Sequence, residues 1–217
     1  MTFGELGRLM SLAIFDLDGT LVDSAPDIHA CLNRLMERRR LAPFALAEVA
    51  AMIGDGARAL VLKGFAARGA LPDEEAVASF LEDLEANSAV LTRPYPGIVE
   101  ALDALTAAGW RLAVCTNKPI AATRALLASL GLAPRFEVVM GGDSLAARKP
   151  DPAHVTGVLD AAGVAAGVST MIGDHQNDIR AANGAGVRSV FAAWGYGTGE
   201  GAALRAETPG ELARLLG

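Results

Sequence analysis

The sequence predicts an α/β fold, a doubly wound parallel sheet with a Rossmann-like core and an inserted α-helical cap domain. Short apolar runs alternate with helix-like stretches along most of the chain, which is typical of a parallel sheet covered by helices. Between about residues 25 and 89 the alternation stops and the pattern is helical throughout. We therefore expect an α/β core made of residues 1–22 and 93–217, and a cap made of residues 23–92.

Five short runs have the character of buried strands. Each run is apolar and is bounded by Gly, Asp or Asn. Near-continuous apolarity indicates burial on both faces, as in a parallel sheet. The predicted strands are residues 12–15, 111–116, 136–140, 169–173 and 188–193.

Helices are expected between these strands, where apolar residues recur with helical spacing. A glycine follows each of them, as is common at helix C-termini. The predicted core helices are residues 97–109, 119–130, 151–163 and 176–186, with Gly109, Gly131, Gly163 and Gly186 at their ends. The predicted cap helices are residues 28–39, 46–53, 57–69 and 73–91. Residues 20–24 and 91–96 would be the hinges between the two parts.

Composition and charge exclude several classes of protein. The net charge of −6 comes without a sustained basic block, which disfavours nucleic-acid binding. Cys31 and Cys115 form neither a disulfide framework nor a metal-binding spacing. Residues 1–10 lack the pattern of a signal peptide, and no apolar stretch reaches the roughly 20 residues of a membrane span. We expect a cytoplasmic monomer or homodimer with no membrane or nucleic-acid partner.

Polar and charged side chains gather at the predicted carboxyl ends of the strands. Ligands of open parallel sheets bind outside these ends. Four separate stretches supply the side chains, namely Asp16 with Asp18, Thr116 with Asn117, Lys149, and Asp174 with Asp178. We expect the four stretches to meet at one site.

The chemistry of this set points to magnesium and phosphate. Carboxylates that converge repel one another unless a cation lies between them. Mg²⁺ prefers oxygen ligands, and no His/Cys set indicates zinc instead. Lys149, Thr116 and Asn117 would hold a phosphate dianion together with the metal. A carboxylate that faces such a phosphate can attack it and form an aspartyl-phosphate.

Four motifs carry a resemblance to a known family. "DLDGTLVDS", "TNK", "KPDP" and "GDHQND", in this order and spacing, resemble the motifs of the haloacid dehalogenase-like hydrolase superfamily. The likeness covers the chain after about residue 10, and the helical insert resembles that superfamily's small α-helical cap. "DLDGTLVDSAPDI" and "GDGARAL" are most similar to its phosphoglycolate phosphatase branch.

The resemblance implies a role for each residue of the core site. Asp16 is the nucleophile and a metal ligand. Asp18 is the general acid/base and offers its main-chain carbonyl to Mg²⁺. Thr116 and Lys149 bind phosphate, and Asp174 ligates the metal.

Other residues have less defined expected roles. Asp178 would support the metal site or Lys149 without ligating the metal directly. His175 stands where many relatives have Ser, and its role is open. In "GDGAR", Gly54, Gly56 and Arg58 would face the site and bind a substrate carboxylate, and a plain helix–helix turn is the alternative.

The implied activity is a magnesium-dependent phosphomonoesterase acting on a small phosphate ester, 2-phosphoglycolate, through an aspartyl-phosphate. A phosphosugar phosphatase or phosphosugar mutase of the same superfamily is one alternative. A non-catalytic phospho-acceptor signalling domain is the alternative from another class. Such domains also place an Asp, acidic metal ligands, Thr and Lys on a doubly wound sheet, but their chains are shorter and have no helical insert.

Overall fold

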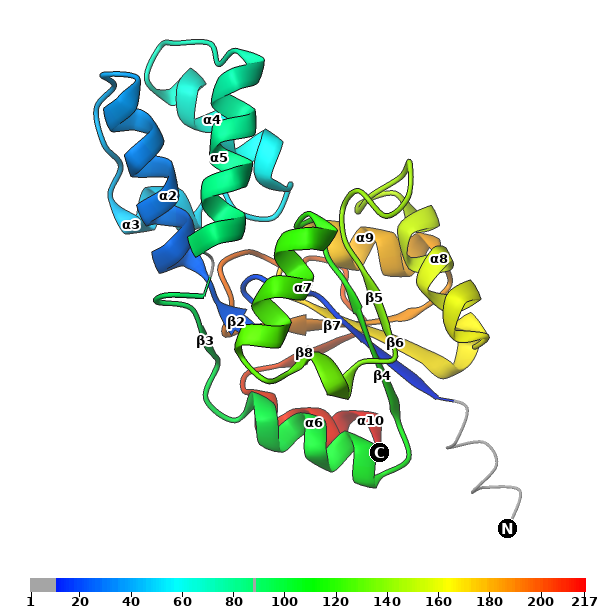
Figure 1. Cartoon of the computed structure of the whole chain (residues 1–217). Coiled ribbons are helices and arrows are strands. Elements are labelled where there is room, and N and C mark those ends of the chain that lie inside the picture. Colours follow the sequence, from blue (N-terminus) through cyan, green and yellow to red (C-terminus); the bar gives the residue numbers. More distant parts are fainter. Residues whose placement is uncertain (1–10, 88) are drawn as a thin grey trace, which may run out of the picture.

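The computed structural model describes residues 11–87 and 89–217 (Figure 1). The expectation that residues 1–10 are not a signal peptide lies outside the described residues. The core is a six-stranded sheet of order β5-β4-β1-β6-β7-β8 in which every pair is parallel. Its strands are β1 (Leu12–Phe15), β4 (Arg111–Cys115), β5 (Val138–Met140), β6 (Ser169–Gly173), β7 (Arg188–Ala192) and β8 (Leu204–Ala206).

Helices cover both faces of this sheet, so the predicted doubly wound fold is confirmed. One face carries α8 (Pro152–Ala162) and α9 (Gln176–Gly184), and the other carries α6 (Ile98–Ala107), α7 (Ile120–Ser129) and α10 (Leu212–Leu216). Short 3₁₀ helices complete the core, namely η1 (Ala133–Arg135), η2 (Ala166–Val168) and η3 (Pro209–Glu211).

The central strand β1 shows why these runs are apolar throughout. Its side chains alternate between the faces, with Leu12 and Ile14 packed under α8 and α9, and Ala13 and Phe15 packed on the opposite side. All four are fully buried. The glycines predicted at the ends of the core helices have φ between 67° and 87°, the left-handed region typical of a helix C-terminus.

The sequence did not reveal β8. This strand has only three residues and lies at the edge of the sheet. Its middle residue, Arg205, is exposed, so the segment lacks the apolar run that marks the interior strands.

The helical insert packs around its own hydrophobic cluster, which includes Leu32, Phe65 and Phe80. Its helices stand apart from the sheet at the upper left of Figure 1. They are α2 (Ala25–Arg38), α3 (Leu46–Ala50), α4 (Ala57–Ala67) and α5 (Glu74–Asn87). Among residues 11–87 and 89–217, no helix of the core or the insert is both long and apolar enough to cross a membrane.

The two connections between insert and core lie side by side. β2 (Val22–Asp23) and β3 (Arg93–Pro94) pair as antiparallel strands at the segments expected to be hinges. The buried Asp27 carboxylate accepts hydrogen bonds from the backbone N–H groups of Leu91 and Thr92, and from the Thr92 hydroxyl. The sequence did not predict this two-residue pairing, because so short a strand has no periodicity.

Candidate active site

The expected site residues meet at the carboxyl edge of the sheet because their strands are neighbours. β1 lies between β4 and β6. Asp16 and Asp18 follow β1, and Asp174 follows β6. The side chains that come from the β4 end and from the start of α8 are Thr116, Asn117, Lys118 and Lys149.

Lys149 is a buried cation at this edge. Its Nζ donates to Oδ1 of Asp16 at 2.9 Å and to Oδ1 of Asp178 at 2.6 Å. It also donates to the Cys115 carbonyl at 2.5 Å. Burial by itself would lower the pKa of Lys149, but the two carboxylates outweigh it and raise the pKa, so the ammonium stays charged.

Asp16 lies in surroundings that disfavour its charge. Burial raises the pKa of Asp16 from 3.8 to about 6, the Lys149 charge opposes this, and the negative Asp178 and Asp18 add to it. A further cation brought close to Asp16 would therefore stabilise the charged form of its carboxylate.

Asp18 is paired with Lys118, a residue to which the sequence gave no role. Lys118 Nζ lies 3.0 Å from Oδ1 and 3.3 Å from Oδ2 of Asp18. Its side chain is only 2% exposed. The letters "TNK" show a lysine after the strand, but only the fold shows that its side chain turns inward.

A cavity of about 40 Å³ opens onto these groups. Its polar wall comes from the core and includes Asp16, Asp18, Thr116, Asn117 and Lys118. Its opposite wall comes from the helical insert, which contributes Ile28, Ile53, Gly54, Gly56, Ala57, Leu60, Phe80 and Leu84.

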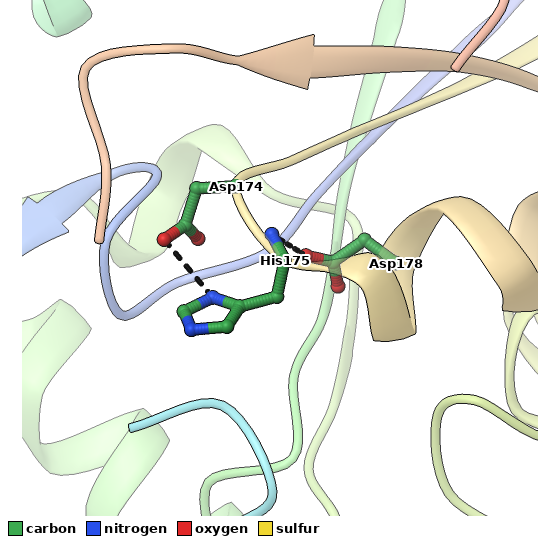
Figure 2. Close-up of side chains that lie close together, drawn as sticks. All are labelled: Asp174, His175 and Asp178. Atoms are coloured by element: carbon green, nitrogen blue, oxygen red, sulfur yellow. Dashed lines mark hydrogen bonds and ion pairs between the residues drawn. The ribbon is translucent and has the colours of Figure 1, made fainter. Parts of the chain in front are cut away.

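Asp174 is held from several sides, partly seen in Figure 2. Oδ1 accepts from the Thr20 hydroxyl at 2.9 Å, and Oδ2 accepts from the Tyr196 N–H at 2.9 Å. Nδ1 of His175 lies 3.0 Å from Oδ2 of Asp174, while the His175 N–H donates to Oδ2 of Asp178 (Figure 2). Burial would lower the pKa of His175, but the hydrogen bond and charge of Asp174, together with the charges of Asp178 and Asp16, outweigh it and raise the pKa to about 9.

The loop before α4 touches the core side of the site. Asn117 donates from Nδ2 to the Gly54 carbonyl at 3.0 Å and to the Lys149 carbonyl at 2.8 Å. Asn177 donates to Oδ1 of Asp55 at 2.6 Å. Gly56 has φ of 90°, and a Cβ there would lie 2.8 Å from the Asn117 carbonyl oxygen, so this close approach requires glycine.

Arg58 lies apart from this group. Its guanidinium pairs with both oxygens of Glu74, at 2.5 and 2.9 Å, and its side chain is 51% exposed. Gly54 and Gly56 line the cavity, whereas Arg58 is not among the lining residues. The structure thus brings together all the expected core residues and the two glycines, but not Arg58.

The donor set suits a hard divalent cation. Four carboxylates (Asp16, Asp18, Asp174 and Asp178) stand beside two lysine ammonium groups and the His175 ring, whose raised pKa favours its charged form, and an excess of negative charge still remains. Atoms of Asp174, His175 and Asp178 that could ligate a metal lie within 4.8 Å of one another. Carboxylate and carbonyl oxygens, which predominate here, are the ligands that Mg²⁺ prefers.

Comparisons with known proteins identify the family of the chain. The family model "Haloacid dehalogenase-like hydrolase" matches residues 13–192. The chain belongs to this family.

Several relatives share a narrower description. The chain is 44% identical to "Phosphoglycolate phosphatase" of Cereibacter sphaeroides (strain ATCC 17029 / ATH 2.4.9), over 84% of this chain and 85% of that protein. It is also 44% identical to "Phosphoglycolate phosphatase" of Caulobacter vibrioides (strain ATCC 19089 / CIP 103742 / CB 15), over 84% of this chain and 78% of the relative. A crystal structure of a predicted phosphoglycolate phosphatase from Haemophilus somnus 129PT superimposes with a TM-score of 0.89 at 29% identity, covering 96% of this chain and 99% of that one.

Proposed function

We propose that this chain is a magnesium-dependent phosphatase that hydrolyses 2-phosphoglycolate through an aspartyl-phosphate on Asp16. One observation carries the proposal: Asp16 faces a small cavity, bonded to a buried lysine, with a second acid, Asp18, on the same wall. The names of the relatives at 44% identity supply the substrate.

Asp16 is the proposed nucleophile. One of its carboxylate oxygens forms a bond to phosphorus while the bond between phosphorus and the ester oxygen breaks. Lys149 neutralises the charge of Asp16 and, with Thr116 and Asn117, holds the phosphoryl oxygens. Buried donors of this kind act more strongly than they would in water.

Asp18 is the proposed general acid and base. Its proton goes to the leaving ester oxygen, which departs as the hydroxyl of glycolate. The resulting carboxylate then takes a proton from water, which attacks the aspartyl-phosphate and releases inorganic phosphate.

Mg²⁺ would be held by the carboxylates of Asp16 and Asp174 and by the main-chain carbonyl of Asp18. Bound there, it would offset the negative charge of the phosphoryl group. Asp178 supports this site indirectly, because it bonds Lys149 and the His175 N–H.

Residues 23–92 are proposed to act as a cap over the core formed by residues 1–22 and 93–217. The apolar wall that this segment gives to the cavity would exclude water during the first step. The paired connections β2 and β3 would allow it to move as one body. The contact between Gly54, Gly56 and the core residue Asn117 supports a role of the loop in shaping the site. We also propose a cytoplasmic monomer or homodimer.

A panel of phosphate esters tests the proposal by release of free phosphate, with Mg²⁺ and with a chelator. We expect the largest kcat/KM for 2-phosphoglycolate and no turnover in the chelator. A preference for hexose phosphates would overturn the substrate and leave a phosphatase. A stable phosphoprotein without turnover would support the signalling-domain alternative.

A further inference from the structure

Lys118 is a buried ammonium group that the proposed mechanism does not use. It follows β4, is 4% exposed and donates to both carboxylate oxygens of Asp18. Among the described residues that line the cavity, it is the one with a positively charged side chain. Burying an ammonium group is costly unless anions accompany it, so its place in the cavity wall calls for an explanation.

Lys118 and Asp18 lie together in the polar wall of the cavity, where Lys118 Nζ contacts Oδ1 and Oδ2 of Asp18 at 3.0 and 3.3 Å. An ammonium group has three N–H donors, so this contact with one carboxylate still allows Lys118 to bond a group inside the cavity. An anion that enters the cavity beside Lys118 can therefore take the place of Asp18 as its partner.

Among the described residues that line the cavity, none besides Lys118 offers a positive charge to such an anion. The wall from the helical insert is apolar where Ile28, Leu60 and Phe80 lie. Arg58, the expected partner, is turned to Glu74 and lies half exposed. An anionic group next to Lys118 would therefore be the carboxylate end of the substrate.

We propose that Lys118 is the residue that recognises the substrate carboxylate, exchanging its bond to Asp18 for a bond to that group. This inference rests on the proposed phosphatase function and names its specificity determinant. Only substrates with a carboxylate near the phosphate can make the exchange. Recognition of the carboxylate and release of Asp18 are then the same event.

Binding of two phosphonates tests the exchange without turnover. 3-Phosphonopropionate copies 2-phosphoglycolate with a CH₂ group in place of the ester oxygen, and propylphosphonate lacks only the carboxylate. We expect the wild type, with Mg²⁺, to prefer 3-phosphonopropionate by about 10- to 100-fold in calorimetry, the range for a charge-assisted hydrogen bond. Lys118→Met should reduce this preference to about twofold or less, while the exposed Lys63→Met serves as the matched control and should keep it.

Kinetics supply a second readout. 2-Hydroxyethyl phosphate has the length of 2-phosphoglycolate but a neutral end. Lys118→Met should therefore lower kcat/KM for phosphoglycolate by a factor at least about tenfold larger than for 2-hydroxyethyl phosphate. If the Met variant does not fold by circular dichroism, Lys118→Gln carries the same test, since it keeps a polar side chain of similar length.

The outcomes separate the inference from the function. A wild type that hydrolyses phosphoglycolate best, with a Lys118 variant that keeps the full preference for the carboxylate, overturns the role of Lys118 alone. Loss of that preference in Arg58→Ala instead would assign the carboxylate to Arg58. A wild type that hydrolyses hexose phosphates in preference to phosphoglycolate overturns the proposed substrate and the inference together.

Discussion

Charged side chains are paired both at the strand ends and in the helical insert, but the cation is buried in the first region and exposed in the second. At the strand ends, the side chains of Lys149 and Asp178 are each 1% exposed and that of Asp16 is 8% exposed. In the insert, Arg34 of α2 bonds both oxygens of Asp83 of α5, and the arginine side chain is 42% exposed while that of Asp83 is 12% exposed. The distances between donor and acceptor are short in both regions, so these distances alone do not distinguish them.

The two regions differ in the free-energy cost of keeping charged side chains there. Removing two ions from water costs several kcal/mol each, and apolar residues could fill the space at the strand ends at least as stably. A surface pair costs little and contributes little. The charged residues at the strand ends are therefore best explained by a role in catalysis, and those in the insert by local stability and solvation.

The sharpest contrast is expected from removing the charge of Asp16. Asp16→Asn keeps the shape of the side chain and an oxygen for Lys149, but the amide cannot attack phosphorus. We expect phosphatase activity to fall by roughly 10⁴-fold or more. Thermal unfolding followed by circular dichroism should show that the variant is folded.

Asp83→Asn is the matched control for Asp16→Asn, because it makes the same change in a paired carboxylate of the insert. It should leave kcat/KM within about twofold of the wild type. Retained activity of Asp16→Asn, together with a trapped phosphoenzyme, would place the nucleophile elsewhere.

Loss of the acid at Asp18 should have the next largest effect. General acid–base catalysis contributes about 10²–10⁴-fold, so Asp18→Asn should lower kcat by that factor. Its main-chain carbonyl remains, so the Mg²⁺ concentration needed for half-maximal rate should change little. The exposed Asp73→Asn serves as control. A loss smaller than about tenfold would exclude Asp18 from the acid/base role.

The contrast also explains how far the sequence predicted the site. Asp16, Asp174 and Lys149 were identifiable because each belongs to a motif at the end of a strand or the start of a helix. In a parallel sheet the ends of neighbouring strands meet at one edge. The order of the motifs along the chain was therefore enough to bring them together.

Other parts of the site depend on packing that the sequence does not display. Thr20 bonds Asp174 across 154 residues, and Tyr196 reaches Asp23 across 173 residues. No local pattern marks either contact. Lys118 and Arg58 illustrate the same limit, since the direction of a long side chain is decided by the partner that the fold brings near, Asp18 in one case and Glu74 in the other.

A buried neutral group near Lys149 should make stability depend on pH. His154 is fully buried. Its Nδ1 accepts a hydrogen bond from the backbone N–H of Lys149, and its Nε2 contacts the Gly141 carbonyl. A carbonyl can only accept, so the proton resides on Nε2. Burial, and then the positive charge of Lys149, lower the pKa of His154 from 6.5 to about 4.

The sign of the effect follows from proton binding. Between pH 6.5 and 4 the unfolded chain binds a proton at His154 that the folded protein excludes, so acid favours unfolding. This group should cost the wild type about 1–2 kcal/mol of stability between pH 7 and pH 5. Urea unfolding at both pH values should show a smaller loss in His154→Gln. An equal loss in both proteins would show that the ring titrates normally.

The smallest effect is expected from the pair in the insert. Arg34 and Asp83 join α2 to α5, and Asn87 also donates to Oδ1 of Asp83, at 2.7 Å. Single replacements by alanine change these other contacts too, so a double-mutant cycle is needed to isolate the pair. A bidentate pair whose arginine remains 42% exposed should give a coupling energy of at most about 1 kcal/mol, measured by urea unfolding. The coupling should fall further in 0.5 M salt, because mobile ions screen exposed charges. A coupling energy above about 2 kcal/mol that salt does not change would mean that the insert shields its charges as the strand ends do, and the contrast between the two regions would no longer hold.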